Sequence, residues 1–216
     1  MVVCKTVTRS ARSQTKADAK RAYLIEQATR CLAEKGYARV SLRDIARESG
    51  VSLGILHYYF AGKEDLLLAV ISGYKERFLR ELEQELLSAP LEGWMDRLLA
   101  VLRRALVEDQ AVHRLWYDFQ VQAMYLPAFR DGVREIRARL FELIGEMLDR
   151  LRREAGFSPL TEADEAVPLL YSLIDGLFFQ ALLDEADDPE QTVNRLEQAL
   201  PRMLALLLSP SSQTER

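Results

Sequence analysis

The stretch SLRDIARESGVSLGILHYYFAGK, residues 41–63, carries the signals for two short helices joined by a tight turn. Ser41 is followed three positions later by an acidic residue, a variant of the capping box that opens a helix. An apolar side follows at helical spacing, and Gly50 fits the end of that helix. Ser52 is placed to cap a second helix, which ends before Gly62. The segment therefore predicts two helices with a glycine in the turn between them.

A third helix is predicted upstream, over residues 20–36. Leu24, Ala28 and Leu32 recur at helical spacing, and Gly36 stands where a helix closes in left-handed geometry. Three short helices with a glycine in the last turn match the helix-turn-helix arrangement, whose last helix enters the major groove of DNA. We therefore predict a DNA-binding domain over residues 20–66.

From Leu24 to Leu67 the sequence closely resembles the DNA-binding domain of TetR-family regulators. The resemblance rests on the ordered series IA-x-x-x-GVS at residues 45–52, the glycine at position 54, the aromatic cluster HYYF at 57–60, and GKEDLL at 62–67. It implies a transcription regulator that binds double-stranded DNA, with repression as the family default.

The predicted DNA-binding residues lie in and around the last helix of this domain. They are Ser41, Arg43, Ser52, Leu53, Gly54, Ile55, His57, Tyr58, Tyr59 and Lys63. The resemblance implies phosphate contacts for Ser41, Tyr59 and Lys63, and an anion also suits Lys63 because free amides at a helix start point toward it. His57 departs from the tyrosine usual in the family, although an imidazole can still donate a hydrogen bond to phosphate.

Base recognition is harder to assign to particular residues than phosphate contact. The first turn of the recognition helix, residues 53–55, offers no side-chain hydrogen-bond donor. Base reading is therefore expected from Arg43, from Tyr58, from apolar contact with thymine methyl groups, or from DNA shape. Gly54 inside a helix costs roughly 1 kcal/mol relative to Ala. Two explanations stay open for it: close approach to the DNA backbone, or helix packing.

Charge is distributed unevenly along the chain, whose formal net charge is −4. Residues 1–62 hold 11 Lys and Arg against 5 Asp and Glu, and the remainder holds 18 against 28. This split favours a polyanionic partner for the N-terminal part, although an unevenly charged solvated surface is the alternative. Residues 1–19 are polar and basic, and we predict a flexible arm that reaches the DNA backbone or minor groove.

Helical periodicity continues through the rest of the chain, and no useful length alternates with period two, so no strand is predicted. Helices are expected at about 62–88, 91–108, 111–125, 127–155, 161–186 and 189–208. Pro168 should kink its helix or mark the true beginning. The predicted fold class is all-α, about nine helices in total: a helix-turn-helix head, a larger helical bundle over 67–208 for ligand sensing and dimerisation, and a frayed tail over 209–216.

The bundle carries enough apolar and aromatic side chains to line a ligand cavity, although the same residues also suit an ordinary core. The candidates for contact with an unknown small-molecule effector are Trp94, Leu98, Trp116, Phe119, Met124, Tyr171, Asp175 and Phe178. Asp175 is the most informative, because a carboxylate in an apolar helix needs a partner or solvent. That partner is either a cationic or hydrogen-bonding effector, or a structural group such as an arginine or a helix end.

The stretch around Asp175, LIDGL-x-x-QALLD, loosely resembles the C-terminal domain of the betaine-pathway repressors within the same family. Family likeness also implies a homodimer in which the last two helices of each subunit form a four-helix bundle. The leucines available for it are Leu169, Leu173, Leu177, Leu182, Leu196, Leu200, Leu204 and Leu207. A two-fold dimer would present two recognition helices to a pseudo-palindromic operator, and an effector would change their separation.

Other functional classes find little support in the sequence. It has no Gly-rich phosphate loop or nucleophile motif, and two histidines and two cysteines stand at no metal-ligand spacing, so we expect no enzyme, cofactor, metal site or disulfide. No signal peptide is visible, and the apolar run 168–183 is shorter than the roughly 20 residues that cross a bilayer. We expect a cytoplasmic protein with no membrane partner. The alternative function is a dimeric interaction protein that has lost sequence-specific DNA binding, which residues 53–57 leave open.

Overall fold

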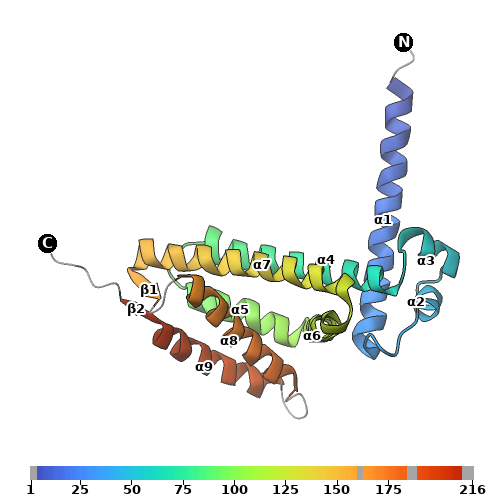
Figure 1. Cartoon of the computed structure of the whole chain (residues 1–216). Coiled ribbons are helices and arrows are strands. Elements are labelled where there is room, and N and C mark those ends of the chain that lie inside the picture. The colour runs from blue at the N-terminus through green and yellow to red at the C-terminus, as the bar shows by residue number, and fades with distance from the viewer. Residues whose placement is uncertain (1–3, 160–162, 184–188, 211–216) are drawn as a thin grey trace.

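The computed structural model describes residues 4–159, 163–183 and 189–210, and this part of the chain contains nine α-helices and one pair of short strands (Figure 1). The helices are α1 (Cys4–Lys35), α2 (Leu42–Glu48), α3 (Leu53–Tyr59), α4 (Lys63–Glu83), α5 (Trp94–Val107), α6 (Gln110–Tyr125), α7 (Pro127–Arg150), α8 (Ala163–Leu183) and α9 (Pro189–Leu207). Five-residue π-helical segments, Gln84–Ser88 and Leu151–Ala155, extend α4 and α7. The predicted all-α class and the predicted order of helices are confirmed.

The head forms from α1, α2 and α3 through the capping signals seen in the sequence. The backbone N–H of Asp44 donates to the Ser41 hydroxyl at 3.3 Å, and the Ser41 N–H donates back to the Asp44 carboxylate at 3.0 Å. Ser52 accepts from the backbone of Ile55 at 3.3 Å. Gly50 has a φ of +63°, a left-handed turn that favours glycine. These signals fix where each short helix begins and ends.

The first helix differs from the prediction, because α1 begins at Cys4 and not near residue 20. The predicted flexible arm is therefore helical from Cys4 onward, and α1 projects well beyond the head (Figure 1). Neither glycine nor proline occurs before Gly36, so nothing in the backbone interrupts a helix that the apolar stripe establishes further along. The polar composition of residues 1–19 therefore did not predict their backbone conformation.

The body is a helical bundle that shares one continuous apolar core with the head. Helix α4 starts at the head and runs into the body, with Leu67, Ile71 and Leu79 buried along it (Figure 1). It lies against α7, and a Cβ atom at Gly132 would come within 2.6 Å of the Leu68 side chain. Glycine at this position therefore lets α4 and α7 approach closely.

Two short strands correct the prediction of a strand-free chain. β1 (Phe157–Pro159) and β2 (Leu208–Pro210) pair antiparallel, with Phe157 opposite Pro210. Three residues each are too few to produce a period-two signal, so the pattern was invisible in sequence. Residues 209 and 210 thus belong to a strand and not to a frayed tail, while 211–216 lie outside the described residues.

Helix α8 lies within the predicted helix of residues 161–186 and begins before the apolar run of residues 168–183. Pro168 lies inside it and does not mark its beginning. By length and composition, the 20 residues from Asp164 to Leu183 are sufficient to cross a membrane, longer than the expected run from 168. This is weak evidence for a span, since Leu170 and Phe178 are buried against the bundle and core helices have the same composition.

Candidate DNA-binding surface and ligand cavity

Helix α3 presents most of its predicted DNA-binding residues to solvent. Among the predicted residues, Ser41, Arg43, Ser52, Gly54, Ile55, His57 and Tyr58 are exposed, while Leu53, Tyr59 and Lys63 are half-buried. Tyr58 is 79% exposed and its ring meets Tyr59 edge to face at 5.0 Å between centroids. Leu56 and Phe60 anchor the other side of the helix in the core. The helix is thus held on one side and open on the other.

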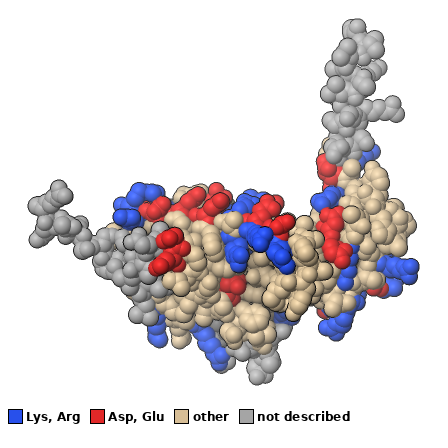
Figure 2. All heavy atoms as spheres, in the orientation of Figure 1, with Lys and Arg blue, Asp and Glu red and all other residues tan. Residues whose placement is uncertain are grey.

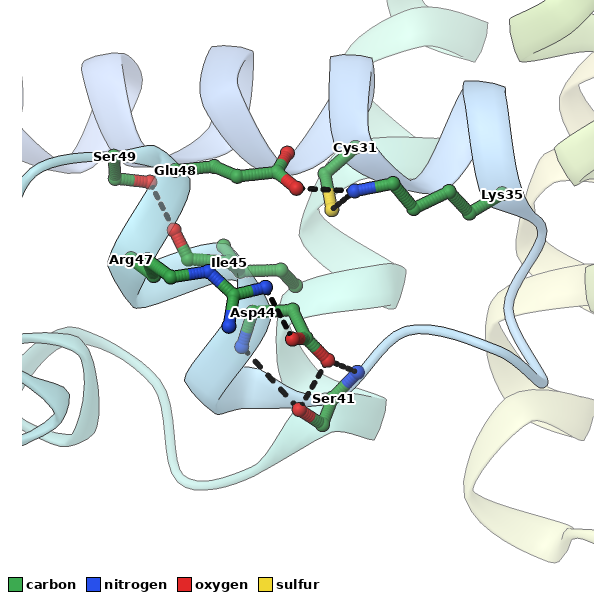
Figure 3. Close-up of polar contacts among 8 residues, drawn as sticks. All are labelled: Cys31, Lys35, Ser41, Asp44, Ile45, Arg47, Glu48 and Ser49. Carbon is green, nitrogen blue, oxygen red and sulfur yellow. Dashed lines mark hydrogen bonds and ion pairs between the residues drawn. The ribbon is translucent and has the colours of Figure 1, made fainter.

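A polar network holds α2 against α1 and so sets the position of the whole motif (Figure 3). The Lys35 ammonium of α1 pairs with the Glu48 carboxylate of α2. The Tyr23 hydroxyl donates to the Ser49 carbonyl at 3.1 Å, beside the end of α2. Cys31 lies buried beneath this network, and burial raises the pKa of its thiol to about 11. The thiol is therefore neutral and serves packing.

Gly54 has no packing reason to be glycine within its own subunit. A Cβ atom there would meet only the Ser52 hydroxyl oxygen, at 3.8 Å, which is ordinary contact. The residue is exposed on α3 and its backbone is helical, so neither crowding nor a left-handed turn requires it. Of the two explanations left open by the sequence, helix packing within the subunit is removed.

Lys63 is the first residue of α4, and its side chain contacts Tyr37, which lies in the turn after α1. Its ammonium donates to the Tyr37 carbonyl and sits 3.9 Å from the centroid of the Tyr37 ring. Partial burial lowers the pKa of Lys63, and Glu64 and Asp118 oppose that shift. These contacts place the ammonium at the junction between the head and the body.

Charged side chains cover both parts of the molecule, and the visible face of the head carries Lys and Arg at its outer edge, around α2 and α3 (Figure 2). Arg43 and Arg47 are exposed on α2, and Arg47 pairs with Asp44 at 2.7 Å. On the same face of the body, acidic and basic side chains are interspersed. Asp and Glu also lie on this face of the head, so basic side chains accompany the motif without forming a purely basic surface (Figure 2).

A cavity of about 120 Å³ lies inside the body, between α4, α5, α6, α7 and α8. Six of the predicted ligand-contact residues line it: Trp94, Leu98, Trp116, Tyr171, Asp175 and Phe178. The other two do not. Phe119 is fully buried and packs on Phe129 at 4.8 Å between ring centroids, and Met124 is 64% exposed on the outside of α6. Helical spacing placed both on α6 but did not show which side faced the cavity.

Lys75 also lines the cavity, and it is not among the residues predicted from the sequence. Its side chain is 2% exposed, and its ammonium lies 4.5 Å from the Trp116 ring centroid and 5.2 Å from that of Phe78. Burial lowers its pKa to about 7, against which Asp175 acts weakly. A signal was present: Lys75 stands four residues from both Ile71 and Leu79, on the buried face of α4.

Asp175 finds its partners among tyrosines. The Tyr117 hydroxyl donates to its backbone carbonyl at 2.9 Å and lies 3.3 Å from its carboxylate, and the Tyr171 hydroxyl lies 3.5 Å from the same carboxylate. Burial raises the pKa of Asp175, while Lys75 and the two tyrosines oppose the shift. Asp175 therefore has structural partners, one of the two alternatives left open by the sequence. They are tyrosine hydroxyls and not an arginine or a helix end.

His113 is the third ionisable group in the lining. It is 3% exposed, and its Nδ1 lies 2.8 Å from the Tyr74 hydroxyl. Its ring contacts Phe178 at 4.8 Å between centroids. Burial, and then the Lys75 charge, lower its pKa well below the ordinary range, so the imidazole is neutral at pH 7. The cavity wall is therefore mainly apolar, with its polar groups gathered near Lys75.

One face of α8 is partly open to solvent, although the Phe179 ring on it contacts Tyr117 at 5.2 Å between centroids. Leu169 is 49% exposed, Phe179 39% and Leu183 61%, and these residues recur at helical spacing. The leucines of α9 behave differently, because Leu196, Leu200 and Leu204 are buried in their own subunit. The Leu207 side chain lies outside the described residues. Of the α8 leucines expected for dimerisation, Leu169 is exposed, Leu173 and Leu177 are half-buried and Leu182 is buried, so the expected face is only partly open.

Two protein families match the chain. Residues 24–70 match the bacterial regulatory proteins of the tetR family, and residues 94–205 match the C-terminal region of the BetI-type transcriptional repressors. The second match covers just over half of the chain and contains most of the cavity lining.

Relatives and solved structures agree with these matches. The HTH-type transcriptional regulator BetI of Brucella anthropi is 30% identical over 175 residues, 79% of this chain and 84% of that relative. BetI of Agrobacterium fabrum is 28% identical over 172 residues, 77% of this chain and 79% of that relative.

A TetR transcription regulator from Haloarcula marismortui superposes with a TM-score of 0.76 at 25% identity, covering 89% of this chain and all of that chain. A transcriptional regulator from Saccharomonospora viridis, solved in complex with choline, has the same TM-score at 24% identity, covering 89% and 99% of the two chains. With its helix-turn-helix head and cavity-containing body, this chain belongs to the TetR family of transcriptional regulators and is a BetI-like repressor.

Proposed function

We propose that the protein binds a pseudo-palindromic operator as a homodimer and is released from it when a small molecule occupies the body cavity. The observation that carries this proposal is the course of α4, which begins at Lys63 in the head and lines the cavity at Lys75. A change of side-chain packing at the cavity is therefore transmitted along one helix to the DNA-binding motif.

The DNA contact is assigned to the open side of α3 and its flanks. Arg43 and Tyr58 are exposed and offer hydrogen-bond donors, so they would read bases or phosphates. Ser41, Ser52, His57, Tyr59 and Lys63 would contact the phosphate backbone, and Leu53 and Ile55 would meet thymine methyl groups. Gly54 would bring the α3 backbone close to the DNA, since packing within the subunit does not explain it.

The open face of α8 supports the homodimer. Exposed leucine and phenylalanine side chains along one helix favour burial against an identical face, which a two-fold axis supplies. Such a dimer holds two heads at a fixed separation, and half-sites for helix-turn-helix dimers lie about 34–36 Å apart or at multiples of that distance. An effector that favours another separation lowers operator affinity.

Six cavity residues support a small-molecule effector: Trp94, Leu98, Trp116, Tyr171, Asp175 and Phe178. A structural neighbour solved with choline is a further support for ligand response in this fold. We further infer that the protein acts by binding and not by catalysis, and that it does so in the cytoplasm, where its DNA would lie. Both inferences follow the regulator family to which it belongs.

The test is to select bound sequences from a random duplex pool with purified protein at a stated salt concentration, and to determine the solution mass alongside. Recovery of a palindrome by a species of twice 24.7 kDa supports the proposal. A monomer, or no enrichment at low salt, would contradict it and favour an interaction protein without sequence-specific DNA binding.

A further inference from the structure

We propose that the cavity takes an amphipathic anion, a molecule with a long apolar chain and an acid group that binds the Lys75 ammonium. This inference rests on the proposed function, because it names the effector class for the same cavity. It starts from a buried cation that the chain leaves without an acidic contact at hydrogen-bond distance.

No hydrogen bond, and no ion pair within 4.0 Å, joins the Lys75 ammonium to any described residue. Its neighbours are the faces of Trp116 and Phe78 and the ring of Tyr74. An ammonium carries three donors, and a buried cation without an oxygen partner is costly. A ligand acid group supplies the missing acceptor and the opposite charge at once.

Asp175 does not supply that acceptor. Its carboxylate accepts from the hydroxyls of Tyr117 and Tyr171, and it influences Lys75 only at longer range. Lys75 therefore remains available to a second anion, while Asp175 limits the total negative charge that the cavity tolerates.

The rest of the lining suits a hydrocarbon chain. From Lys75 the cavity continues along α4 past Phe78 and Leu82 to Leu86. The eleven residues from Lys75 on α4 to Leu86 in its π-helical extension correspond to a wall about 16 Å long, so a long chain must widen the cavity of about 120 Å³ by moving the helices around it. The wall at the far end is formed by leucines of α7 and its extension, Leu148 and Leu151. Burial of an apolar chain there supplies affinity, and the acid group supplies orientation.

A small quaternary ammonium ion fits this arrangement poorly. Aromatic faces attract cations, but the faces of Trp116 and Phe78 already hold the Lys75 ammonium. A second cation would meet repulsion from the Lys75 ammonium, and Asp175, the acidic residue of the lining, already accepts from the hydroxyls of Tyr117 and Tyr171. The structure therefore separates two ligand chemistries, and a direct comparison tests them.

The experiment titrates the wild-type protein at pH 6, where Lys75 carries its proton, with dodecanoate, 1-dodecanol, dodecyltrimethylammonium and choline, each kept below its aggregation threshold. Intrinsic fluorescence reports binding, because Trp94 and Trp116 are the only tryptophans and both line the cavity. We expect dodecanoate to bind at least about tenfold more tightly than dodecanol, the gain typical of a charge-assisted contact. The two cationic ligands should bind more weakly still.

Two substitutions on α4 test the role of Lys75. Lys75→Met should remove the preference for dodecanoate over dodecanol, and Lys75→Arg should keep it. Arg77→Met is the matched control, because Arg77 is exposed, pairs with Asp109 at 3.0 Å and does not line the cavity. It should keep the preference as well. The ligand titrations of the wild-type protein test the inference by themselves, so they are sufficient even if Lys75→Met fails to fold.

Equal binding of dodecanoate and dodecanol by the wild type, or tighter binding of either cation, would overturn the inference. Retention of the full preference by folded Lys75→Met would do the same. Operator binding in the absence of ligand is measured separately by gel shift. Loss of that binding would contradict the proposed function, whereas a failed ligand preference with intact operator binding contradicts only the anionic effector.

Discussion

The backbone N–H of Tyr37 donates to the carboxylate of Asp118 at 3.0 Å, joining positions 81 residues apart in the chain. Tyr37 lies in the turn after α1, and Asp118 lies on α6 two positions after Trp116, which lines the cavity. The Tyr37 carbonyl accepts from Lys63, at the start of α4. One residue therefore connects the first helix of the head, the linking helix and a cavity wall.

This connection predicts that Asp118 transmits ligand occupancy to the head. Asp118→Ala leaves the Tyr37 N–H without its acceptor, so the dodecanoate-induced loss of operator affinity should shrink, from a coupling of about 1–3 kcal/mol toward zero. Operator titrations with and without dodecanoate measure the coupling. Asp118→Asn keeps an oxygen acceptor and should preserve most of it. Unchanged coupling in Asp118→Ala would show that α4 alone carries the signal.

Gly54→Ala should separate stability from DNA binding. Alanine in place of an exposed helical glycine stabilises the fold by up to about 1 kcal/mol, and here the new Cβ has space. The same methyl group would hold the α3 backbone away from the operator and lower its affinity. Thermal unfolding and gel shift measure the two effects. A variant that binds operator as the wild type does would rule out close backbone approach at this position.

The lowered pKa of Lys75 predicts that the stability of the fold depends on pH. Because burial lowers its pKa to about 7 from 10.5, the unfolded chain binds one more proton than the folded protein between those values. Stability should therefore rise with pH above 7, by at most about 1.4 kcal/mol per unit. The rise in stability should end near pH 10. At that pH the tyrosines of the unfolded chain begin to ionise, whereas burial raises the pKa of Tyr74 and Tyr171 in the folded protein.

Denaturant unfolding of the wild type and of Lys75→Met across this window checks the prediction. The variant should lose most of the rise, since Asp175 is already ionised when unfolded and His113 is neutral in both states above pH 7. A parallel slope in the two proteins would assign the pH dependence to another group.

Lys63→Ala should weaken DNA binding by a similar factor for all sequences and lower the slope of log affinity against log salt by about two per dimer, one for each subunit. Its removal also frees the Tyr37 carbonyl, so a small loss of stability is expected. Arg152→Ala removes an exposed positive charge in the Leu151–Ala155 segment, beyond the C-terminal end of α7, and should leave the salt slope unchanged. A wild-type slope in Lys63→Ala would show that Lys63 meets no phosphate.

Leu169→Glu should separate the dimer. A charge placed on the open face of α8 cannot be buried against an identical face without a large desolvation cost. Sedimentation should then report a monomer, and operator affinity should fall because two heads no longer bind together. Val107→Glu, at a similarly exposed apolar position on α5, is the control and should remain dimeric. A dimeric Leu169→Glu would place the interface elsewhere.

The sequence predicted those features that local chemistry determines. Ser41 and Ser52 capped their helices as expected, and Gly36 and Gly50 took left-handed turns, because capping and turn signals depend on a few adjacent residues. The TetR-like motif identified the head for the same reason. Where a feature is encoded within a few residues, the prediction succeeded.

Features set by tertiary packing were less predictable. Phe119 and Met124 share α6 with Trp116, yet only the packing of the bundle decides which side chain reaches the cavity. The burial of Lys75 depends on the aromatic residues brought to it by other helices. The pairing of β1 with β2 joins segments about 50 residues apart, a contact that no local pattern encodes.

Operator binding by a homodimer is the central claim, and selection from random duplex DNA coupled to a solution mass tests it most directly. The account predicts an enriched palindrome bound by a species of twice 24.7 kDa, with affinity that falls steeply as salt rises. A monomer, or a pool that shows no enrichment at any salt concentration, would contradict it.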